Sequence, residues 1–570
     1  MRVALTFLGV AIPLAAYAAL YDNPASLPGR QYDFIIVGAG AAGSVLANRL
    51  SASPHNNVLL IEAGHSALYP SDTVQPDIPI PFLCTALSNT IVDWNYTTVP
   101  QVGLKNRTLA YPRGKTLGGS TSINYMVWSH GPGDDYDRWA HVTGDPGWSW
   151  KFMQPILKSI EKLVPPADHH NTTGQINPRL HGTVQGFPSD LDSRVVSATA
   201  QLSQEFPFNE DTNSGNPLAL VGWNQFAVGG GMRTSASTAY LKPVLSRSNL
   251  DVLINTQVTK VLRTSERNGV PVFLGVQFAQ SEASRVYTLK AAKEVILSAG
   301  AVNTPQLLMI SGIGDPTQLG KFGIKTIVNL PDHVVLPNVW SVNANFTYDD
   351  LTRNVSVFET FLAQWTANKT GPFATAPNEQ IGWLRLPQNA SIFTRVPDPS
   401  SGPRSPHYEF IFAESFASFV EPPPATGHYM MIASNLITPT SRSPWQAPLI
   451  DPALLNSDFD IFAIREAIKA AQRFAAAPAW KGYVIGPFGD LATAKTDAEL
   501  EEYARRHAAT VFHPVGTAAM APKHSSAGVV DPDLVLKGAV GLRIVDASVF
   551  VAAIYAFAER AARLILSSHY

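Results

Sequence analysis

Short apolar runs and helix-spaced apolar positions alternate along the chain in a pattern typical of an α/β fold. The run Tyr32–Val37 predicts a buried strand, the pattern over Ser44–Leu50 predicts a helix, and the run Val58–Ile61 predicts a second strand. Later runs at Val252–Leu262 and Glu294–Ser298 predict further strands. The first three segments form one strand–helix–strand unit, which is the building block of a parallel sheet.

A glycine-rich turn joins the first predicted strand to the predicted helix. Residues 38–43 read Gly-Ala-Gly-Ala-Ala-Gly, and Glu62 follows the last glycine by nineteen positions. Gly38 permits a tight turn, Gly40 lets the backbone approach a pyrophosphate, and Gly43 lets helix and strand pack closely. The helix N-terminus would bind the phosphates, and Glu62 would accept hydrogen bonds from ribose hydroxyls. The unit predicts a dinucleotide site, with NAD and FAD both open.

The composition is that of a large globular chain with little net charge. Its 570 residues exceed the roughly 100–200 residues of one domain, so two large domains are expected. The 45% hydrophobic and 15% charged residues exclude a disordered chain. A net charge of −2 gives no sign of binding to nucleic acid or an anionic membrane. The single cysteine, Cys84, excludes intrachain disulfides and Cys-rich metal sites, and no HExxH or other metal-ligand spacing occurs.

The first residues and the glycosylation sequons predict a secreted protein. Residues 1–18 have a positive start, an apolar run and an Ala-Tyr-Ala cleavage signal, which favours a signal peptide over a membrane anchor. We therefore expect an extracellular, soluble protein, and a monomer. Seven Asn-x-Ser/Thr sequons predict glycans at Asn95, Asn106, Asn171, Asn345, Asn354, Asn368 and Asn389.

Two longer motifs resemble those of a known family. Residues 112–124 read Pro-Arg-Gly-Lys-Thr-Leu-Gly-Gly-Ser-Thr-Ser-Ile-Asn, and residues 300–314 contain Gly-Ala-Val-Asn-Thr-Pro-Gln-Leu-Leu and Ser-Gly-Ile-Gly. These resemble the two signatures of the glucose–methanol–choline (GMC) flavoprotein oxidoreductases. That family binds FAD, so the resemblance favours FAD over NAD. Blocks at residues 93–98, 164–168 and 511–517 are most similar to secreted fungal aryl-alcohol oxidases.

The resemblance assigns a set of residues to the cofactor. Gly38, Gly40, Gly43 and Glu62 would hold the ADP half of FAD. The first signature and two later segments would contact the rest of the cofactor through Arg113, Gly118, Gly119, Ser120, Asn124, Val258, Asp546 and Ala547.

The resemblance also implies a catalytic base and an alcohol pocket. His513 matches the base, and imidazole is the usual base near neutral pH. The pocket would be shaped by the aromatic residues Tyr96, Phe416, Phe419 and Phe512. The implied reaction oxidises a primary aromatic or conjugated alcohol to an aldehyde by hydride transfer to the flavin. Oxygen would then take the electrons and give hydrogen peroxide, a chemistry associated with lignocellulose degradation.

Three other functions stay open at this stage. The same scaffold could serve a dehydrogenase that reduces a quinone in place of oxygen. The chain could instead be a non-catalytic relative that binds FAD. A binding module without FAD is disfavoured by both signatures.

The chain departs from the family pattern beside the predicted catalytic site. Family members carry a second His or Asn in a loop before the final helix, and about ten residues of that loop are absent after Phe550. The four residues 551–554 span at most about 14 Å and cannot follow the same path. Smaller gaps occur before Asp332, near residues 182–186 and near residues 441–445. A mis-assembled gene model and a real, repurposed protein both explain these gaps. We expect weak or no alcohol oxidation, with an open flavin face.

The resemblance and the order of motifs predict two interleaved domains of an α/β fold. A Rossmann-like FAD-binding domain would comprise residues 30–150, 225–325 and 505–570. An α+β substrate domain with an antiparallel sheet would comprise residues 151–224 and 326–504. Within the latter, apolar residues at helical spacing predict a helix over Asp458–Ala475.

Overall fold

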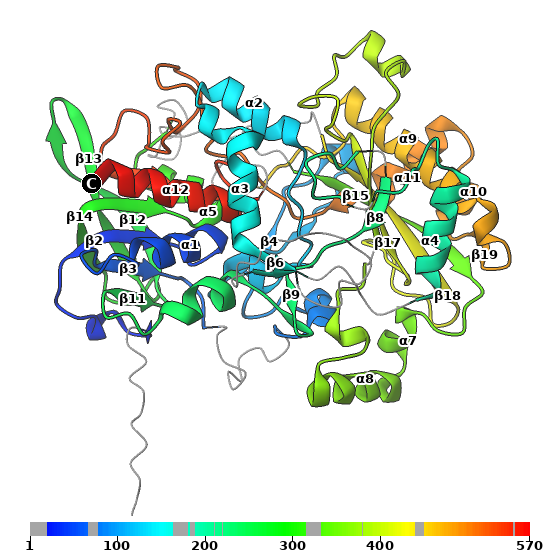
Figure 1. Ribbon diagram of the computed structural model, residues 1–570, viewed down its shortest axis with the longest axis horizontal. Helices are drawn as coiled ribbons and strands as arrows, with labels where there is room; N and C mark the ends of the chain where they lie inside the picture. The colour runs from blue at the N-terminus through cyan, green and yellow to red at the C-terminus, as the bar shows by residue number, and fades with distance from the viewer. Residues whose placement is uncertain are drawn as a thin grey trace, which may run out of the picture.

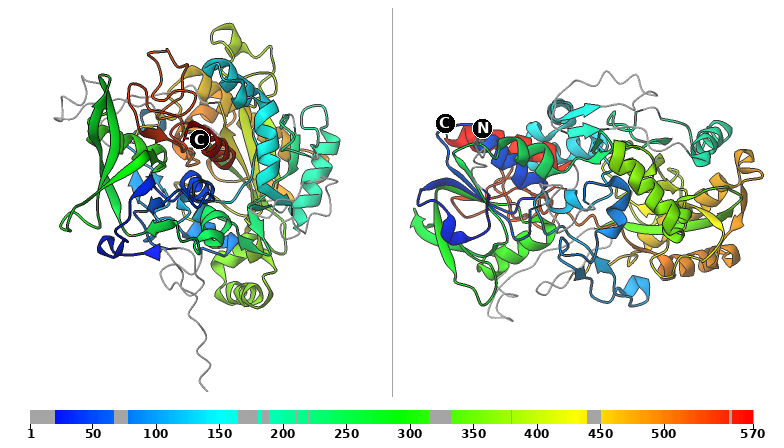
Figure 2. Two further views of the ribbon diagram at one scale, coloured as in Figure 1. Left: turned by 60° about the vertical axis from the view of Figure 1, so that its left-hand side comes forward. Right: turned by 90° about the horizontal axis from the view of Figure 1, so that it is seen from below.

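The computed structural model describes residues 20–66, 78–163, 180–182, 189–209, 211–218, 220–314, 332–378, 380–438, 450–550 and 553–569. These residues form two halves that lie side by side along the longest axis of the molecule, each built round one sheet (Figures 1 and 2). The predicted signal peptide and Asn171 lie outside the described residues. So do residues 164–168 and 551–552, and most of the smaller gap positions.

The first sheet combines strands from three separate parts of the chain. Its neighbouring strands run parallel from β1 to β14, with β21 also parallel to β14, whereas β12, β13 and β14 are antiparallel. The described strands, in spatial order, are β1 (Leu20–Tyr21), β11 (Leu250–Leu253), β3 (Val58–Ile61), β2 (Tyr32–Val37), β14 (Tyr287–Leu297), β13 (Val270–Ala279) and β12 (Gln257–Arg267), with β21 (Leu542–Ile544) beside β14.

The sequence prediction of one strand over Val252–Leu262 is wrong, because the chain breaks between β11 and β12. Asn255 has a left-handed backbone (φ 53°), a conformation that asparagine tolerates better than most residues. The Asn255 and Thr256 N–H groups donate to the carbonyls of Gly64 and Glu62. The break moves the chain from the parallel part of the sheet into the antiparallel part.

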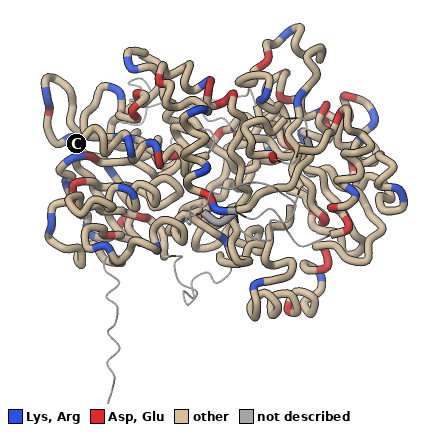
Figure 3. The backbone as a smooth tube through the Cα atoms, viewed as in Figure 1, with Lys and Arg blue, Asp and Glu red and all other residues tan. Residues whose placement is uncertain are grey.

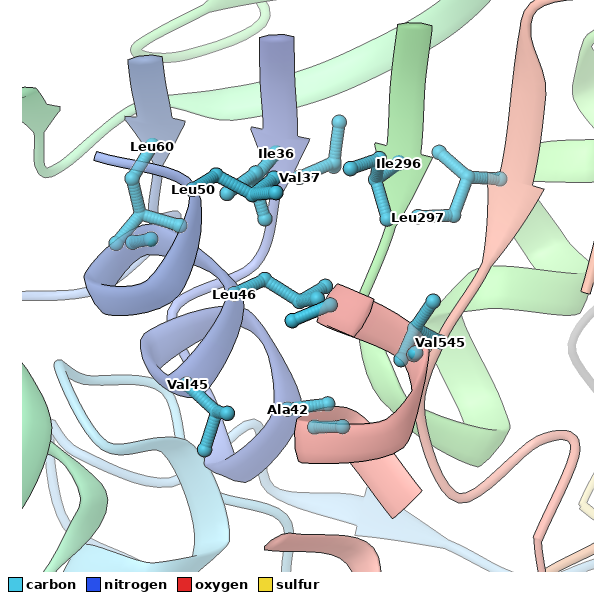
Figure 4. Packing of buried hydrophobic residues seen from close by; sticks show 14 of the residues in the cluster. Ile36, Val37, Ala42, Val45, Leu46, Leu50, Leu60, Ile296, Leu297 and Val545 are labelled. Carbon is cyan, nitrogen blue, oxygen red and sulfur yellow. The ribbon is translucent and has the colours of Figure 1, made fainter. Parts of the chain in front are cut away.

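Helix α1 (Ala41–Leu50) covers one face of this sheet. Its apolar residues, including Leu46 and Leu50, pack with Ile36 of β2 and Ile296 of β14, all of them fully buried (Figure 4). Burying one such side chain stabilises the fold by roughly 1.5–3 kcal/mol. Helix α12 (Ile554–His569) packs against α1, so the end of the described chain closes the same layer.

The second sheet is antiparallel and forms the other half. Its described strands, in spatial order, are β19 (Val484–Pro487), β15 (Val334–Val342), β18 (His428–Leu436), β17 (Tyr408–Ala413), β16 (Gln380–Leu384) and β8 (Leu220–Trp223), with β20 (Ala509–Thr510) beside β15. Helix α9 occupies Asp458–Ala475, as predicted, and its buried face packs on β17 and β18. The α/β fold class with an antiparallel second sheet is confirmed.

The remaining elements connect or flank the two halves. The helices are α2 (Gly133–Thr143), α3 (Trp150–Ile160), α4 (Asp190–Gln201), α5 (Gly300–Ile310), α7 (Tyr348–Arg353), α8 (Val355–Asn368), α10 (Asp490–Thr493) and α11 (Asp497–His507). Short strand pairs are β4 (Tyr96–Thr97) with β5 (Ala110–Tyr111), β6 (Glu161–Leu163) with β7 (Leu180–Gly182), and β9 (Val228–Gly229) with β10 (Met232–Arg233).

The surface carries acidic and basic residues interspersed over both halves (Figure 3). Within the described ranges, none of the helices combines the length and the apolar character of a membrane span.

Candidate functional site

A cavity of about 1380 Å³ extends between the two sheets. Residues of the glycine-rich turn, the 112–124 run, the 510–515 segment and four strands of the second sheet line it. Among the sequence-predicted residues, those that line it are Gly38, Gly40, Glu62, Arg113, Gly119, Ser120, Asn124, Val258, Phe416, Phe419, Phe512, His513, Asp546 and Ala547.

The nucleotide end of the cavity is built from backbone atoms. Helix α1 begins after Gly40 without a side-chain cap and without an acidic residue in its first turn, so its N–H groups face an open space. A Cβ atom on Gly40 would meet no protein atom within 4 Å, whereas one on Gly43 would lie 1.9 Å from the Gly38 carbonyl oxygen. Gly43 therefore makes the helix–strand contact, and Gly40 leaves the approach free for a phosphate.

Glu62 is held at the end of β3 by two backbone donors. The N–H groups of Ala39 and Gly64 each donate to one of its carboxylate oxygens at 2.8 Å. Burial raises the pKa of Glu62 to about 7, although these two donors act in the opposite direction. Each oxygen keeps a second lone pair, which is what a ribose hydroxyl needs.

The 112–124 run forms a folded loop whose side chains bind one another. Arg113 donates to the Ser120 hydroxyl from Nη2 at 2.7 Å and to the Phe512 carbonyl from Nη1 at 2.6 Å. Asn124 Oδ1 accepts from Arg233 Nη1 at 3.0 Å, which leaves its amide NH₂ group available to the cavity. Gly118 does not line the cavity; it has φ 90° and donates to the Ala39 carbonyl.

Asp546 ties the late segment to the N-terminus of α5. Its carboxylate accepts from the Gly300 N–H at 2.9 Å and from the Thr304 hydroxyl at 2.6 Å. Its other oxygen accepts from the Ser548 N–H. Val258, just after the break between β11 and β12, lines the cavity on the side of the glycine-rich turn. Residues far apart in the chain thus meet at one site.

His513 faces the cavity where the two halves meet. Its side chain is exposed and lines the cavity. Desolvation by the surrounding protein and the positive charge of Arg113 lower the pKa of His513 to about 4. The imidazole is therefore neutral at physiological pH and has a lone pair that can accept a proton.

A buried carboxylate, Asp332, positions the His513 segment. One oxygen accepts from the N–H groups of His333 and His513, at 2.8 and 2.9 Å. The other accepts from the hydroxyls of Tyr111 and Thr510, at 2.7 and 2.5 Å. Burial raises the pKa of Asp332, and the hydrogen bonds from these donors oppose that rise. Sequence reasoning missed this role, although the adjacent Asp-His pair before a strand was visible.

A second imidazole lies beside His513. The Nδ1 atoms of His333 and His513 are 3.4 Å apart, and their rings meet edge to face. His333 therefore brings a second imidazole next to the predicted base.

Phe512 has a left-handed backbone, with φ 65°. For a bulky residue this conformation costs of order 1–3 kcal/mol and persists only where the surroundings enforce it. Here the Phe512 carbonyl accepts from Arg113 and its N–H donates to the Thr510 hydroxyl. The strained turn directs the next residue, His513, into the cavity.

The aromatic residues predicted for the alcohol pocket occupy different positions. Phe512, Phe416 and Phe419 line the cavity, but Tyr96 does not. The Tyr96 hydroxyl donates to Asn303 Oδ1 at 2.8 Å, and its ring stacks on Trp94. Trp94, which sequence reasoning did not select, lines the cavity in its place.

Comparison with known proteins identifies the family. Two family models match the chain, both described as GMC oxidoreductase, over residues 32–335 and 433–557. The chain belongs to the GMC oxidoreductase family. Its curated relatives include fungal dehydrogenases. Dehydrogenase eriK of Hericium erinaceus is 37% identical over 98% of both chains, and pyranose dehydrogenase 3 of Leucoagaricus meleagris is 36% identical over 100% of this chain and 98% of the relative.

Solved structures of this GMC family support the same fold. One is a formate oxidase from Aspergillus oryzae, whose structure was solved to study modification of its FAD. It has a TM-score of 0.85 and 27% identity, covering 95% of this chain and 99% of that one. A fungal aryl-alcohol oxidase has a TM-score of 0.76 and 25% identity, with the same coverage of both chains. The likeness to aryl-alcohol oxidases is therefore more distant than the sequence blocks suggested.

The cofactor of this GMC chain is FAD, and the cavity fits it. The open glycine turn, the uncapped α1 N-terminus and the buried Glu62 suit the ADP half, and the 112–124 loop suits the flavin. In the described part of the chain, no three His, Cys, Asp or Glu residues gather as they would round a metal ion.

The comparison also bears on the gaps in the sequence. The alignment with dehydrogenase eriK extends over 606 positions, more than the 570 residues of this chain, so that relative has residues where this chain has none.

Proposed function

We propose that this chain is an FAD-dependent alcohol dehydrogenase that passes electrons to a quinone-type acceptor. The observation that carries the proposal is the position of His513, whose segment Asp332 and Arg113 hold against a cavity between the cofactor loop and the second sheet. The choice of dehydrogenase follows the curated relatives, four of which are pyranose dehydrogenases.

The residues of this chain would supply the base and its orientation. His513 would accept the hydroxyl proton of the alcohol, which water alone removes too slowly. Asp332 and Arg113 hold the segment that carries His513, so the ring is oriented before substrate arrives. FAD, when bound, supplies the acceptor for the hydride from the alcohol carbon. Phe512 and Trp94 would limit the entry of water.

A second candidate is an aryl-alcohol oxidase that reduces oxygen to hydrogen peroxide. The aromatic side chains of Phe416, Phe419 and Phe512 in the cavity lining favour it, because aromatic rings bind one another edge to face. The two candidates share the first half-reaction and differ in the oxidant.

Stopped-flow reduction of the purified holoenzyme without oxygen tests the shared step. Rapid bleaching of the bound flavin by benzyl alcohol or D-glucose is expected. Reoxidation by benzoquinone, with little peroxide under air, would support the dehydrogenase, and stoichiometric peroxide would favour the oxidase. A flavin that no alcohol in the panel bleaches would contradict both and leave the non-catalytic FAD-binding relative.

We also propose that the protein is secreted and glycosylated. The six described sequon asparagines, Asn95, Asn106, Asn345, Asn354, Asn368 and Asn389, are all solvent-exposed, as a glycan requires. Expression in a fungal host followed by treatment with an endoglycosidase should lower the apparent mass of protein recovered from the medium.

A further inference from the structure

A second cavity lies on the other face of the antiparallel sheet. Its volume is about 610 Å³, which is within the range of small-molecule sites. Successive residues of a strand point to opposite faces, so Tyr408 of β17 lines this cavity whereas its neighbour Glu409 lines the first one. Leu384 of β16 pairs directly with Tyr408 and lines the same cavity. The sheet therefore separates the second cavity from the one that His513 lines.

One stripe of helix α9 forms another wall of this second cavity. Arg465, Glu466 and Arg473 follow Phe462 by three, four and eleven positions, so these side chains lie on one side of the helix. They are exposed or partly buried, whereas other residues of α9 are fully buried in the core. The cavity therefore opens at the surface, where a small molecule can enter it from solvent.

The charged groups at the second cavity balance one another. Arg473 Nε donates to Glu205 at 2.9 Å, and Arg465 Nε donates to Glu466 at 3.1 Å. A charged ligand would lie beside a like charge in either pair, and a lining without net charge would not attract it. The second cavity therefore favours a neutral molecule. Its described lining contains three cationic and three acidic residues: Arg385, Arg465, Arg473, Glu205, Glu466 and Asp497.

Much of the remaining lining is apolar. Leu384 and Leu386 are each only 3% exposed, and Leu218 and Ala390 line the cavity with them. The ring of Phe462 is partly buried at the same cavity. Aliphatic side chains favour an apolar body, and an aromatic edge favours a second aromatic ring.

The hydroxyl of Tyr408 is the polar group of this apolar wall. Tyr408 is 6% exposed, and its hydroxyl has no hydrogen-bond partner among the described residues, although it is not fully enclosed. Burial raises the pKa of Tyr408; the charge of Glu205 adds to this rise and that of Arg473 opposes it. The hydroxyl therefore stays protonated beside that ion pair. A hydroxyl both donates and accepts, so this one calls for a hydrogen bond to a ligand or a water molecule.

We infer that the second cavity is a binding site for a neutral aromatic molecule with a hydroxyl group, that is, a phenol. Its hydroxyl would pair with the Tyr408 hydroxyl, and its ring would pack on Leu384 against the edge of Phe462. A sugar would place most of its hydroxyls against aliphatic side chains, where they find no partner. The site lies outside the FAD cavity, so this inference does not depend on the proposed function.

Equilibrium dialysis of the oxidised holoenzyme with 4-fluorophenol tests the site, while flavin absorbance reports any binding beside the cofactor. The wild type should bind one molecule that leaves the flavin spectrum unchanged. Ala390→Trp places a large side chain in the second cavity, so it should abolish this flavin-silent binding. The flavin content and the spectral response of the flavin should stay the same in that variant.

Tyr408→Phe removes only the hydroxyl, so the test stays decisive if Ala390→Trp does not fold. It should weaken the flavin-silent binding roughly 2- to 10-fold, the effect of losing one neutral hydrogen bond. Tyr429→Phe is the matched control, because Tyr429 is also 6% exposed and its hydroxyl donates to the Thr426 carbonyl at 3.1 Å. Tyr429 lines neither cavity, so its variant should bind 4-fluorophenol as the wild type does.

Three outcomes would overturn the site. They are a wild type without flavin-silent binding, full binding by a folded Ala390→Trp protein, and equal effects of the two tyrosine variants. Dialysis with 4-fluorobenzoate tests the class of ligand, because this ion should bind at the flavin-silent site at least about tenfold more weakly than the phenol. Tighter binding of the benzoate would reject a site for neutral phenols.

Discussion

At the nucleotide end of the cavity, the wall is formed by the backbone of a few short segments. At the opposite end, the wall is formed by side chains on four strands. Gly38, Gly40 and the N-terminus of α1 lie close together in the chain, within residues 38–41. Trp383, Glu409 and Ala433, which line that end, are separated by more than twenty residues each and meet only through strand pairing. The first end is therefore specified locally, and the second end only by the complete sheet.

The largest effect should come from the glycine turn, where two similar substitutions separate folding from cofactor binding. Gly43→Ala places a Cβ atom 1.9 Å from the Gly38 carbonyl oxygen, so the strand–helix unit cannot form and no soluble flavoprotein is expected. Gly40→Ala meets no protein atom, so the protein should fold but lose most of its FAD, because the methyl group occupies the phosphate approach. Flavin absorbance per protein and circular dichroism measure the two outcomes. A Gly40→Ala protein that binds as much FAD as the wild type would contradict the proposed difference between the two ends of the cavity.

The second-largest effect is expected on the rate of flavin reduction when His513, the predicted base, is replaced. His513→Ala should slow flavin reduction by benzyl alcohol roughly 100- to 10,000-fold while leaving FAD content unchanged. Stopped-flow absorbance gives the rate, and His524→Ala, at an exposed histidine, serves as the control. A loss of FAD equal to the loss of rate would show that His513 is structural.

A third effect tests the stability of the first sheet. Arg543 of β21 donates to Glu294 of β14 at 2.6 and 2.9 Å, and both residues are buried. Arg543→Met would leave a buried carboxylate with only His569, which should lower the midpoint of urea unfolding by the equivalent of about 3–5 kcal/mol. Lys105→Met, which breaks the exposed pair with Glu502, should cost about 0–1 kcal/mol. Similar shifts for both variants would argue against a buried ion pair.

The smallest effect concerns pH. Burial and Arg113 lower the pKa of His513 from 6.5 to about 4, so the neutral base persists as the pH falls. The value of kcat/KM for benzyl alcohol should change little between about pH 7.5 and 5.5, and it should fall only as the pH approaches about 4. A base with an ordinary pKa would lose about tenfold over the same interval.

The sequence was sufficient for the parts of the molecule where neighbours in the chain are neighbours in space. The β2–α1–β3 unit and helix α9 lie where hydrophobic periodicity placed them, because their patterns are local. The prediction of one continuous strand through Asn255 was wrong, because hydrogen bonds to the distant carbonyls of Gly64 and Glu62 stabilise the break.

The same distinction applies to the site. Residues in signature motifs could be selected from the sequence, and most of them line the cavity. Tyr96 was assigned by motif alone, yet its neighbour Trp94 is the residue that reaches the lining. Asp332 and His333 carry no motif that states their roles, which depend on contacts between distant segments.

The alternation of residues along the second sheet has a consequence for how this protein can change. Leu336, Phe410, Ile432 and Leu436 point to the opposite face and pack in the core with α9, while their immediate neighbours face the cavity. An exchange at Glu409 or Trp383 would therefore change the cavity wall without removing a residue from that core. The shape of the cavity and the packing of α9 can thus be altered independently of each other.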